Sequence, residues 1–331
     1  MATAPDTPLM QQWRDVKRRH GDALVFFRVG DFYELFHGDA EEGAKILGLT
    51  LTSRNNGSSA RVPLAGIPVK ALDDYLPRLV MAGRRVAICE QVEDPAEAKG
   101  LVRREVTETI TPGTVLHDAL LADRRNTFLV AVTPEEDGAR GVAALDLSTG
   151  ELTVQEVGEM ALAHELGRLE PSEVLLPRGD DDALSDALER IGPSPAMTER
   201  DPWLFDPELT RDELARRYRV QGLDGFGFED GDGLLVRAAG ALIAYVHEIR
   251  PAGVAHLRPP RILRPGASMV LDEMTRRNLE LVEPLRAGEA GGTLLEVLDE
   301  PVTAMGARLP RLPVRAPPNA TESLRQSLPT V

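Results

Sequence analysis

The sequence is poor in the residues that cross-link small proteins or bind metal ions. Its 331 residues include one cysteine, Cys89, which excludes a disulfide framework and a zinc site made of several cysteines. The six histidines have neither HxxxH nor HxH spacing. No apolar run approaches the ~20 residues that span a bilayer, and the N-terminus has no apolar stretch of the signal-peptide type. We therefore expect a cytoplasmic protein without a metal site or a membrane contact.

The sequence also lacks the short motifs of common enzymes. No G-x-x-x-x-G-K-[ST] phosphate loop occurs in it. No Ser-His-Asp grouping can be assigned from the sequence alone. Cys89 lies in the apolar stretch VAICEQ, where burial would keep its thiol protonated and inert. We therefore expect no enzymatic activity and no cofactor in this chain.

Lysine is scarce, and charge is unevenly distributed. All four lysines lie in the first third of the chain. The net charge of −15 argues against a generic nucleic-acid binder, which usually carries a basic surface. Residues 116–260 hold 14 basic and 28 acidic side chains, whereas residues 1–115 hold 15 and 16 and residues 261–331 hold nine of each. The acidity is confined to the middle of the chain, which leaves the first part able to meet a polyanion.

Hydrophobic patterns predict an α/β protein with two folded modules. In the first module we expect strands at 24–30, 49–54 and 85–92, helices at 39–48 and 72–83, a loop at 55–61 and a turn at 63–68. In the second we expect strands at 126–132 and in SEVLLP, a hairpin within 141–157, and four helices that include 232–250. Strands followed by alternating strands and helices are typical of an α/β module.

The few aromatic residues are clustered. Four of the eight phenylalanines fall within eleven residues, with Tyr33 among them: Phe26, Phe27, Phe32 and Phe36. One interpretation is a small aromatic core, in which Phe32 and Phe36 lie on one face of a turn. The other starts from Asp31 and Glu34, which stand beside the rings after a glycine. An apolar ring can wedge between stacked bases at a cost of a few kcal/mol, less at a defective base pair, while a carboxylate hydrogen-bonds a base edge.

Six stretches of the first module resemble, in order, the N-terminal mismatch-recognition domain of the MutS family of DNA mismatch repair proteins. They are GDFYELF (30–36), LTLTSR (49–54), PLAGIP (63–68), AICEQVEDP (87–95), KGLVRREV (99–106) and TPGT (111–114). The similarity continues through ALDLSTGEL (144–152), ILRPGASMVLDEMTRRNLEL (262–281) and TLLEVLDEPVTAMGARL (293–309). It covers about nine-tenths of the chain without rearrangement, and it favours the wedge over the aromatic core.

The resemblance implies the fold class and the domain limits. It predicts a mixed-sheet mismatch-recognition domain (1–115), an RNase H-like connector domain (116–260), the start of an α-helical core (261–309) and a Pro-rich irregular tail (310–331). The tail carries five prolines in 22 residues, and proline costs ~3 kcal/mol in a helix interior. A frame change or a truncated reading frame would explain why the resemblance ends at Leu309.

The resemblance also implies roles for individual residues. Phe32 would stack on the mispaired base, and Glu34 would hydrogen-bond that base. We expect Glu34 to be protonated in the complex, because nearby phosphate charges disfavour its ionisation. Candidate phosphate contacts, which position a protein without reading sequence, lie in or beside the matching stretches; the alternative for each is a solvated surface charge. These candidates are Arg54, Lys70, Arg103 and Arg104.

Asp146, in ALDLSTGEL, raises an alternative of another class. A carboxylate at the centre of a strand before a tight hairpin is the pattern of RNase H-like nucleases, whose two metal ions need several converging carboxylates. The sequence does not place a second carboxylate beside it, and the MutS connector is similar to the RNase H fold without the nuclease activity. We therefore interpret Asp146 as structural, with a metal-dependent nuclease as the alternative function.

The resemblance also carries expectations about partners. Full-length MutS proteins are far longer, and their C-terminal ATPase makes most of the homodimer, so ATP and Mg²⁺ are expected only with that missing part. The expected partners of this chain are mismatched double-stranded DNA and, through the connector, MutL. A third interpretation is an inactive, monomeric fragment, because the few phosphate contacts that remain are salt-sensitive. The sequence leaves the mismatch preference open.

Overall fold

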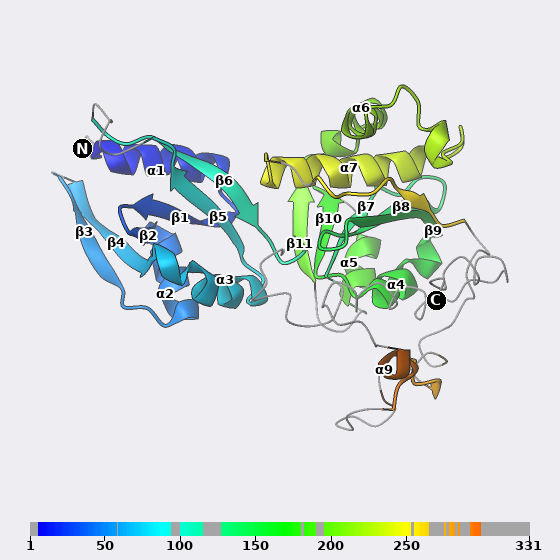
Figure 1. Ribbon diagram of the computed structural model, residues 1–331, viewed down its shortest axis with the longest axis horizontal. Helices are drawn as coiled ribbons and strands as arrows, with labels where there is room; N and C mark the ends of the chain where they lie inside the picture. The colour runs from blue at the N-terminus through cyan, green and yellow to red at the C-terminus, as the bar shows by residue number, and fades with distance from the viewer. Residues whose placement is uncertain are drawn as a thin grey trace. The chain divides into compact units, whose positions relative to one another are not determined.

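The computed structural model shows two compact units (Figure 1), one from residues 1–112 and 246–254 and the other from residues 113–245 and 255–331. It describes residues 6–57, 59–93, 100–114, 127–179, 182–189, 195–252, 255–264, 275, 278–281, 284 and 292–298. Each unit contains a mixed six-stranded sheet, which confirms the predicted α/β class. The limits expected at residues 115, 260 and 309 stay predictions.

The sheet of the first unit has the strand order β3-β4-β2-β1-β5-β6. Its strands are β1 (Ala23–Val29), β2 (Phe32–Phe36), β3 (Thr52–Asn56), β4 (Ser59–Pro68), β5 (Arg85–Gln91) and β6 (Arg104–Ile110). β1 runs parallel to β5, and every other neighbouring pair is antiparallel. The helices are α1 (Pro8–Arg19), α2 (His37–Leu47), the 3-10 helix η1 (Val69–Ala71) and α3 (Leu72–Met81). The helices predicted at 39–48 and 72–83 and the strands predicted at 24–30 and 85–92 are confirmed.

Helix α1, which the sequence analysis did not predict, packs on one face of this sheet. Its buried side chains belong to one apolar cluster with residues of β1, β2, β4 and β5: Met10, Trp13, Val16, Val25, Phe27, Phe36, Val62, Ala87 and Cys89. The Trp13 ring meets the Phe36 ring edge-on, with 5.9 Å between centroids. Cys89 is buried as expected, and burial raises the pKa of its thiol to about 12.

The predictions of a loop at 55–61 and a turn at 63–68 are wrong. PLAGIP lies inside β4, and only the tip around Gly57 separates β3 from β4. β4 pairs with β3 through residues 59–64 and with β2 through residues 64–68. Pro63 therefore has a neighbouring strand on one side only, and Pro68 is the last residue of β4, so neither ring removes a ladder hydrogen bond that a central strand needs.

The sheet of the second unit has the order β11-β10-β7-β8-β9-β12. Its strands are β7 (Phe128–Val132), β8 (Ala139–Asp146), β9 (Glu151–Gly158), β10 (Glu173–Pro177), β11 (Ala196–Arg200) and the two-residue β12 (Arg261–Ile262). β7, β8 and β9 form an antiparallel meander, while β10 and β11 continue in parallel from β7. This order, an antiparallel meander extended by two parallel strands, agrees with the expected RNase H-like connector.

Helices cover both faces of the second sheet (Figure 1). They are α4 (Glu159–Leu169), α5 (Asp182–Glu189), α6 (Pro207–Tyr218) and α7 (Gly233–Ile249), with short 3-10 turns η2 (Pro202–Phe205) and η3 (Asp224–Phe226). The four predicted helices and the predicted hairpin are confirmed. β11 and β12 were not predicted, because both are short and only part of β11 is buried.

The C-terminal predictions fall mainly outside the described residues. After Arg264 the structure describes a few positions and one short helix, α9 (Leu294–Leu298). The helix-like run from Thr275 is covered only at its ends, and residues 310–331 lie outside the described part. Among the described residues, no helix has both the length and the apolar character to cross a membrane.

Candidate nucleic-acid interface

Phe32 is exposed at the tip of the β1–β2 hairpin. Val29 pairs with Phe32, so Gly30 and Asp31 form a two-residue turn, and Gly30 has a φ of +61° that glycine accommodates at no steric cost. Phe32 is 49% exposed, whereas Phe26, Phe27 and Phe36 are fully buried. The aromatic cluster is therefore a core with one ring outside it.

The position of α1 explains why Phe36 is buried and Phe32 is not. Residues 32, 34 and 36 lie on the same face of β2, because side chains alternate along a strand. Trp13 of α1 covers that face at Phe36. The exposed side-chain fraction then rises to 16% at Glu34 and the residue exposure to 49% at Phe32. The interpretation of Phe32 and Phe36 as two residues of one turn is wrong, since both belong to β2.

The hairpin tip is held by two neighbouring elements. The Val69 N–H of η1 donates to the Asp31 carbonyl over 2.9 Å. Arg28 donates through Nε to the Gly30 carbonyl at 3.3 Å and through Nη1 to Glu90 of β5 at 2.7 Å. The Tyr33 hydroxyl also donates to Glu90, and burial is the main reason why the pKa of Tyr33 is raised. The ring of Phe32 thus stands on a turn whose backbone is fixed from both sides.

Glu34 is half-buried and forms an ion pair with Arg54 of β3. Arg54 Nη1 donates to Glu34 Oε2 at 2.5 Å. Burial raises the pKa of Glu34 above its ordinary value, and the charges of Arg54 and Arg104 act in the opposite direction. The protonation state of the Glu34 carboxyl therefore depends on the charges of two arginines, of which Arg54 lies at the surface.

The structure does not bring all four predicted basic residues to one surface. Arg54 is 36% exposed and lies beside Glu34, and Lys70 is exposed in η1, next to the residue that holds the tip. Arg103 is exposed and forms a loose ion pair with Glu105 at 3.6 Å. These three remain candidate phosphate contacts.

Arg104 lies inside the first unit. Its Nη1 donates to the Val102 carbonyl at 2.8 Å and to Gln12 at 3.1 Å, and its Nε donates to the Arg28 carbonyl at 2.5 Å. Its guanidinium also lies over the Phe27 ring, 5.2 Å from the centroid. Because these contacts use the guanidinium within the domain, we correct its assignment from a surface phosphate contact to an internal link between β6, β1 and α1.

Asp146 is buried and serves the β8–β9 turn. Its Oδ1 accepts hydrogen bonds from Ser148 N at 2.8 Å, Ser148 Oγ at 2.6 Å and Thr149 N at 3.3 Å. Such a carboxylate turn explains its place before the hairpin without a metal ion. Within the described part of the chain, no group of three or more His, Cys, Asp or Glu side chains is arranged to hold a metal.

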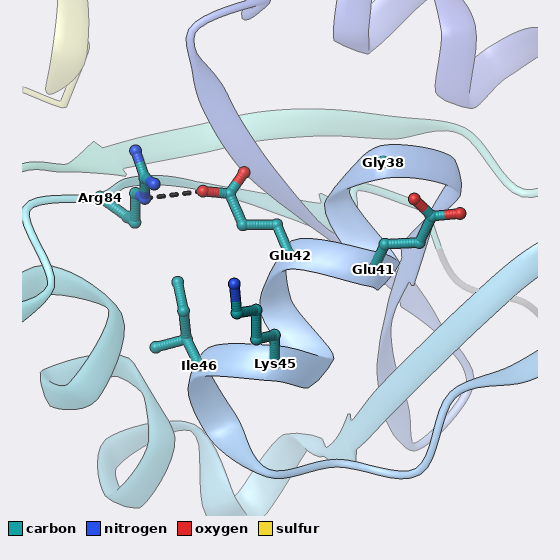
Figure 2. A pocket seen from close by; sticks show the side chains of 6 residues that line it. All are labelled: Gly38, Glu41, Glu42, Lys45, Ile46 and Arg84. Atoms are coloured by element: carbon teal, nitrogen blue, oxygen red, sulfur yellow. Dashed lines mark ion pairs between the residues drawn. The ribbon is translucent and has the colours of Figure 1, made fainter.

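A shallow hollow lies on α2, away from the hairpin tip. Figure 2 shows its lining by Gly38, Glu41, Glu42, Lys45, Ile46 and Arg84. Arg84 forms an ion pair with Glu42 over 2.7 Å. The hollow is open and lined by charges of both signs, unlike the enclosed apolar pockets that bind small molecules. It contains none of the predicted site residues.

Sequence patterns alone do not predict the residues that support the tip. Arg28 and Glu90 are 62 positions apart, and they meet because β1 and β5 are neighbours in the sheet. Gly66, opposite Glu34 on β4, was also missed; a Cβ there would lie only 3.2 Å from the Tyr33 carbonyl oxygen. A glycine inside a predicted strand signals a close approach of this kind, but the two prolines of residues 63–68 predict a turn.

Comparison with known proteins gives matches along the whole chain, so the expectation that the resemblance ends at Leu309 is wrong. The family model for MutS domain I matches residues 7–119, and that for MutS domain II matches residues 127–258. The chain is 40% identical over 333 residues to a protein named DNA mismatch repair protein MutS from Desulfosudis oleivorans, an alignment of 100% of this chain and 38% of that protein. Proteins of the same name from Chlorobium phaeobacteroides and Chlorobium phaeovibrioides are each 39% identical, over 98% and 97% of this chain and 38% and 37% of theirs. The chain therefore spans less than two-fifths of the length of these relatives.

Proposed function

Since the chain belongs to the MutS family, we propose that it takes part in DNA mismatch repair by recognising mismatched or unpaired bases in duplex DNA. The observation that carries this proposal is the half-exposed Phe32 ring on an anchored hairpin tip. Single exposed apolar residues are common on protein surfaces. This one stands on a rigid turn, and its strand neighbour on the same face is a half-buried carboxyl, which is the combination that wedging and base recognition require.

The energetics favour a defective base step as the site of insertion. A wedge pays for unstacking with a few kcal/mol, and this cost is smallest where pairing is already broken. Stacking of a base on an aromatic side chain returns about 1–3 kcal/mol. The two terms are of similar size, so insertion is favourable at a mispair and unfavourable at an intact pair. The selectivity arises from the DNA, and the protein supplies a ring in a fixed place.

Glu34 has a complementary role in this proposal. It lies on the same face of β2 as Phe32, two residues further along the strand. In its protonated form it can donate a hydrogen bond to a base acceptor and avoids repulsion by the phosphates. Burial already raises the pKa of Glu34 in the DNA-free structure, which favours that form. Arg54, Lys70 and Arg103 would contact phosphates around the wedge.

The remaining partners are proposed by analogy with the family. We assign ATP and Mg²⁺ binding and most homodimer contacts to the part of longer relatives that this chain does not span, and MutL binding to the acidic residues 116–260. The cytoplasm is the proposed location. The matched ranges are domains I and II, and the sequence contains no phosphate loop, so this chain offers no evident ATP site of its own.

The test compares a duplex that contains one unpaired thymine with its fully paired counterpart, by fluorescence anisotropy at low salt. We expect the wild-type chain to prefer the heteroduplex and Phe32→Ala to lose this preference. Met81→Ala is the matched control, because Met81 is an exposed apolar residue of the same unit, 75% exposed, in α3. Equal affinity of the wild-type chain for both duplexes, or a Phe32→Ala variant that keeps the preference, would refute the proposal.

A further inference from the structure

The ion pair between Glu34 and Arg54 crosses the sheet of the first unit. Glu34 is on β2 and Arg54 is on the edge strand β3, with β4 between them. The two side chains meet at 2.5 Å. The exposed fraction is 16% for the Glu34 side chain and 36% for that of Arg54. The guanidinium therefore lies on the solvent side of a carboxyl that is itself sheltered.

Local backbone features allow this contact. Gly66 of β4 pairs with Glu34, and a Cβ there would lie 3.2 Å from the Tyr33 carbonyl oxygen, so the glycine lets β4 approach β2 closely at this point. The β3–β4 pairing shifts register between Arg54 and Asn56, and such irregularities bend a strand and redirect its side chains. The Thr7 N–H and hydroxyl hold the Asn56 side chain at 3.0 and 2.9 Å. The end of β3 is thus fixed at Asn56, two residues after Arg54.

The charges that act on Glu34 come from two strands. Arg54 on β3 and Arg104 on β6 both favour the carboxylate, and burial opposes it. Arg104 is engaged by the Arg28 and Val102 carbonyls and by Gln12 inside the domain. Of the two arginines, Arg54 is the one that reaches the surface, so a ligand can draw its guanidinium away from Glu34.

We propose that Arg54 is a positioning residue for Glu34: it holds the carboxylate in the DNA-free protein and releases it when a DNA phosphate takes over the guanidinium. This inference rests on the proposed function, since it gives Glu34 a place in base recognition. The exchange breaks the Arg54–Glu34 hydrogen bond and forms an Arg54–phosphate hydrogen bond. One proton from solvent then adds to a Glu34 oxygen, which becomes a donor for the base.

The exchange is energetically cheap because the two pairings resemble each other. A partly exposed ion pair contributes little to stability. Arginine binds phosphate with charge-assisted and often bidentate hydrogen bonds, which are among the stronger ones in proteins. The loss of the first pair is therefore offset by the second. The carboxyl left behind faces burial and the phosphate field, both of which favour its neutral form.

The first test uses the 331-residue chain without DNA. The Glu34 carboxyl is titrated by carbon-detected NMR in wild type, Arg54→Gln, Arg54→Lys and Arg61→Gln. We expect Arg54→Gln to shift the Glu34 pKa upward and Arg54→Lys to restore most of the wild-type value. Arg61→Gln, which removes an exposed charge from the adjoining strand β4, should leave it unchanged. An unchanged Glu34 titration in Arg54→Gln would overturn the inference, whatever the chain does with DNA.

The second test measures heteroduplex binding from pH 6 to 9 and over a range of low salt. We expect wild type to take up a proton on binding, Arg54→Gln to show a smaller pH dependence, and its salt slope to fall by about one. An unchanged slope in Arg54→Gln would also overturn the inference. If wild type lacks any heteroduplex preference, the proposed function fails, and the NMR titration alone then decides whether Arg54 controls Glu34.

Discussion

Replacing Phe32 by alanine separates a binding role of this ring from a structural one. Fully burying a phenylalanine contributes about 1.5–3 kcal/mol, and truncation inside a core costs about 3–5 kcal/mol because a cavity remains. Phe32 is half-exposed, so its truncation opens no cavity and should cost about 1 kcal/mol of unfolding free energy. The same substitution at the buried Phe36, which packs on Trp13, should cost the full 3–5 kcal/mol.

In contrast to its small effect on stability, Phe32→Ala should have a large effect on DNA binding. Loss of a base-stacking ring removes about 1–3 kcal/mol, which corresponds to a drop in heteroduplex affinity of about 5- to 160-fold. Affinity for the paired duplex should stay within about twofold, because backbone contacts are untouched. Urea denaturation and anisotropy titration of one protein preparation give both numbers. A Phe32→Ala variant destabilised as strongly as Phe36→Ala would show that the ring belongs to the core and that the reasoning is wrong.

Three further predictions concern charge. Burial raises the pKa of Glu34, so the folded chain binds that proton more tightly than the unfolded chain does. The resulting stabilisation is complete below the unfolded pKa of about 4.3 and is lost as the pH rises through the higher folded pKa. Glu34→Gln should therefore reduce the pH dependence of the urea midpoint between these two pKa values. A pH profile of the midpoint equal to that of wild type would contradict this. Glu173→Ala should destabilise the second unit by about 1–3 kcal/mol for each buried donor it strands, since Glu173 accepts from Gly113 N, Thr198 Oγ1 and Tyr245; calorimetry checks this, with exposed Glu199 of the adjoining strand as the control. Lys70→Gln should reduce the salt slope of binding to either duplex by about one, and an unchanged slope would exclude it as a phosphate contact.

Much of the fold follows from local patterns. The apolar run at 24–30 and the turn STG between two alternating strands specify β1 and the β8–β9 hairpin, because these signals act over a few residues. Gly48 ends α2 with a φ of +70°, as a helix C-terminus favours. The two prolines in PLAGIP led to the wrong prediction of a turn, because the effect of a proline in a strand depends on which strands lie on each side of it. That information is in the pairing of β4 with β2 and β3, which is not local.

The site was predictable in its residues and not in its geometry. The spacing of Phe32 and Glu34 is visible in the sequence, but their different exposure depends on which part of β2 is covered by α1. Arg54 and Arg104 look alike as basic residues near matching stretches. Both belong to edge strands, β3 and β6, so strand position does not separate them. Arg104 is enclosed because it lies over Phe27 and contacts Gln12 of α1, whereas Arg54 stays 36% exposed.

The alternation along β2 makes this site intolerant of changes in length. Phe32 and Glu34 share one side of the strand, while Tyr33 between them reaches Glu90 from the other. Deleting a single residue from β2 would exchange the two sides of the strand. Tyr33 would then face the DNA, and Phe32 and Glu34 would face the interior. Libraries that vary this hairpin should therefore keep its number of residues fixed. Loop insertions should be placed at the β3–β4 tip, where they do not change which side of β2 each residue faces.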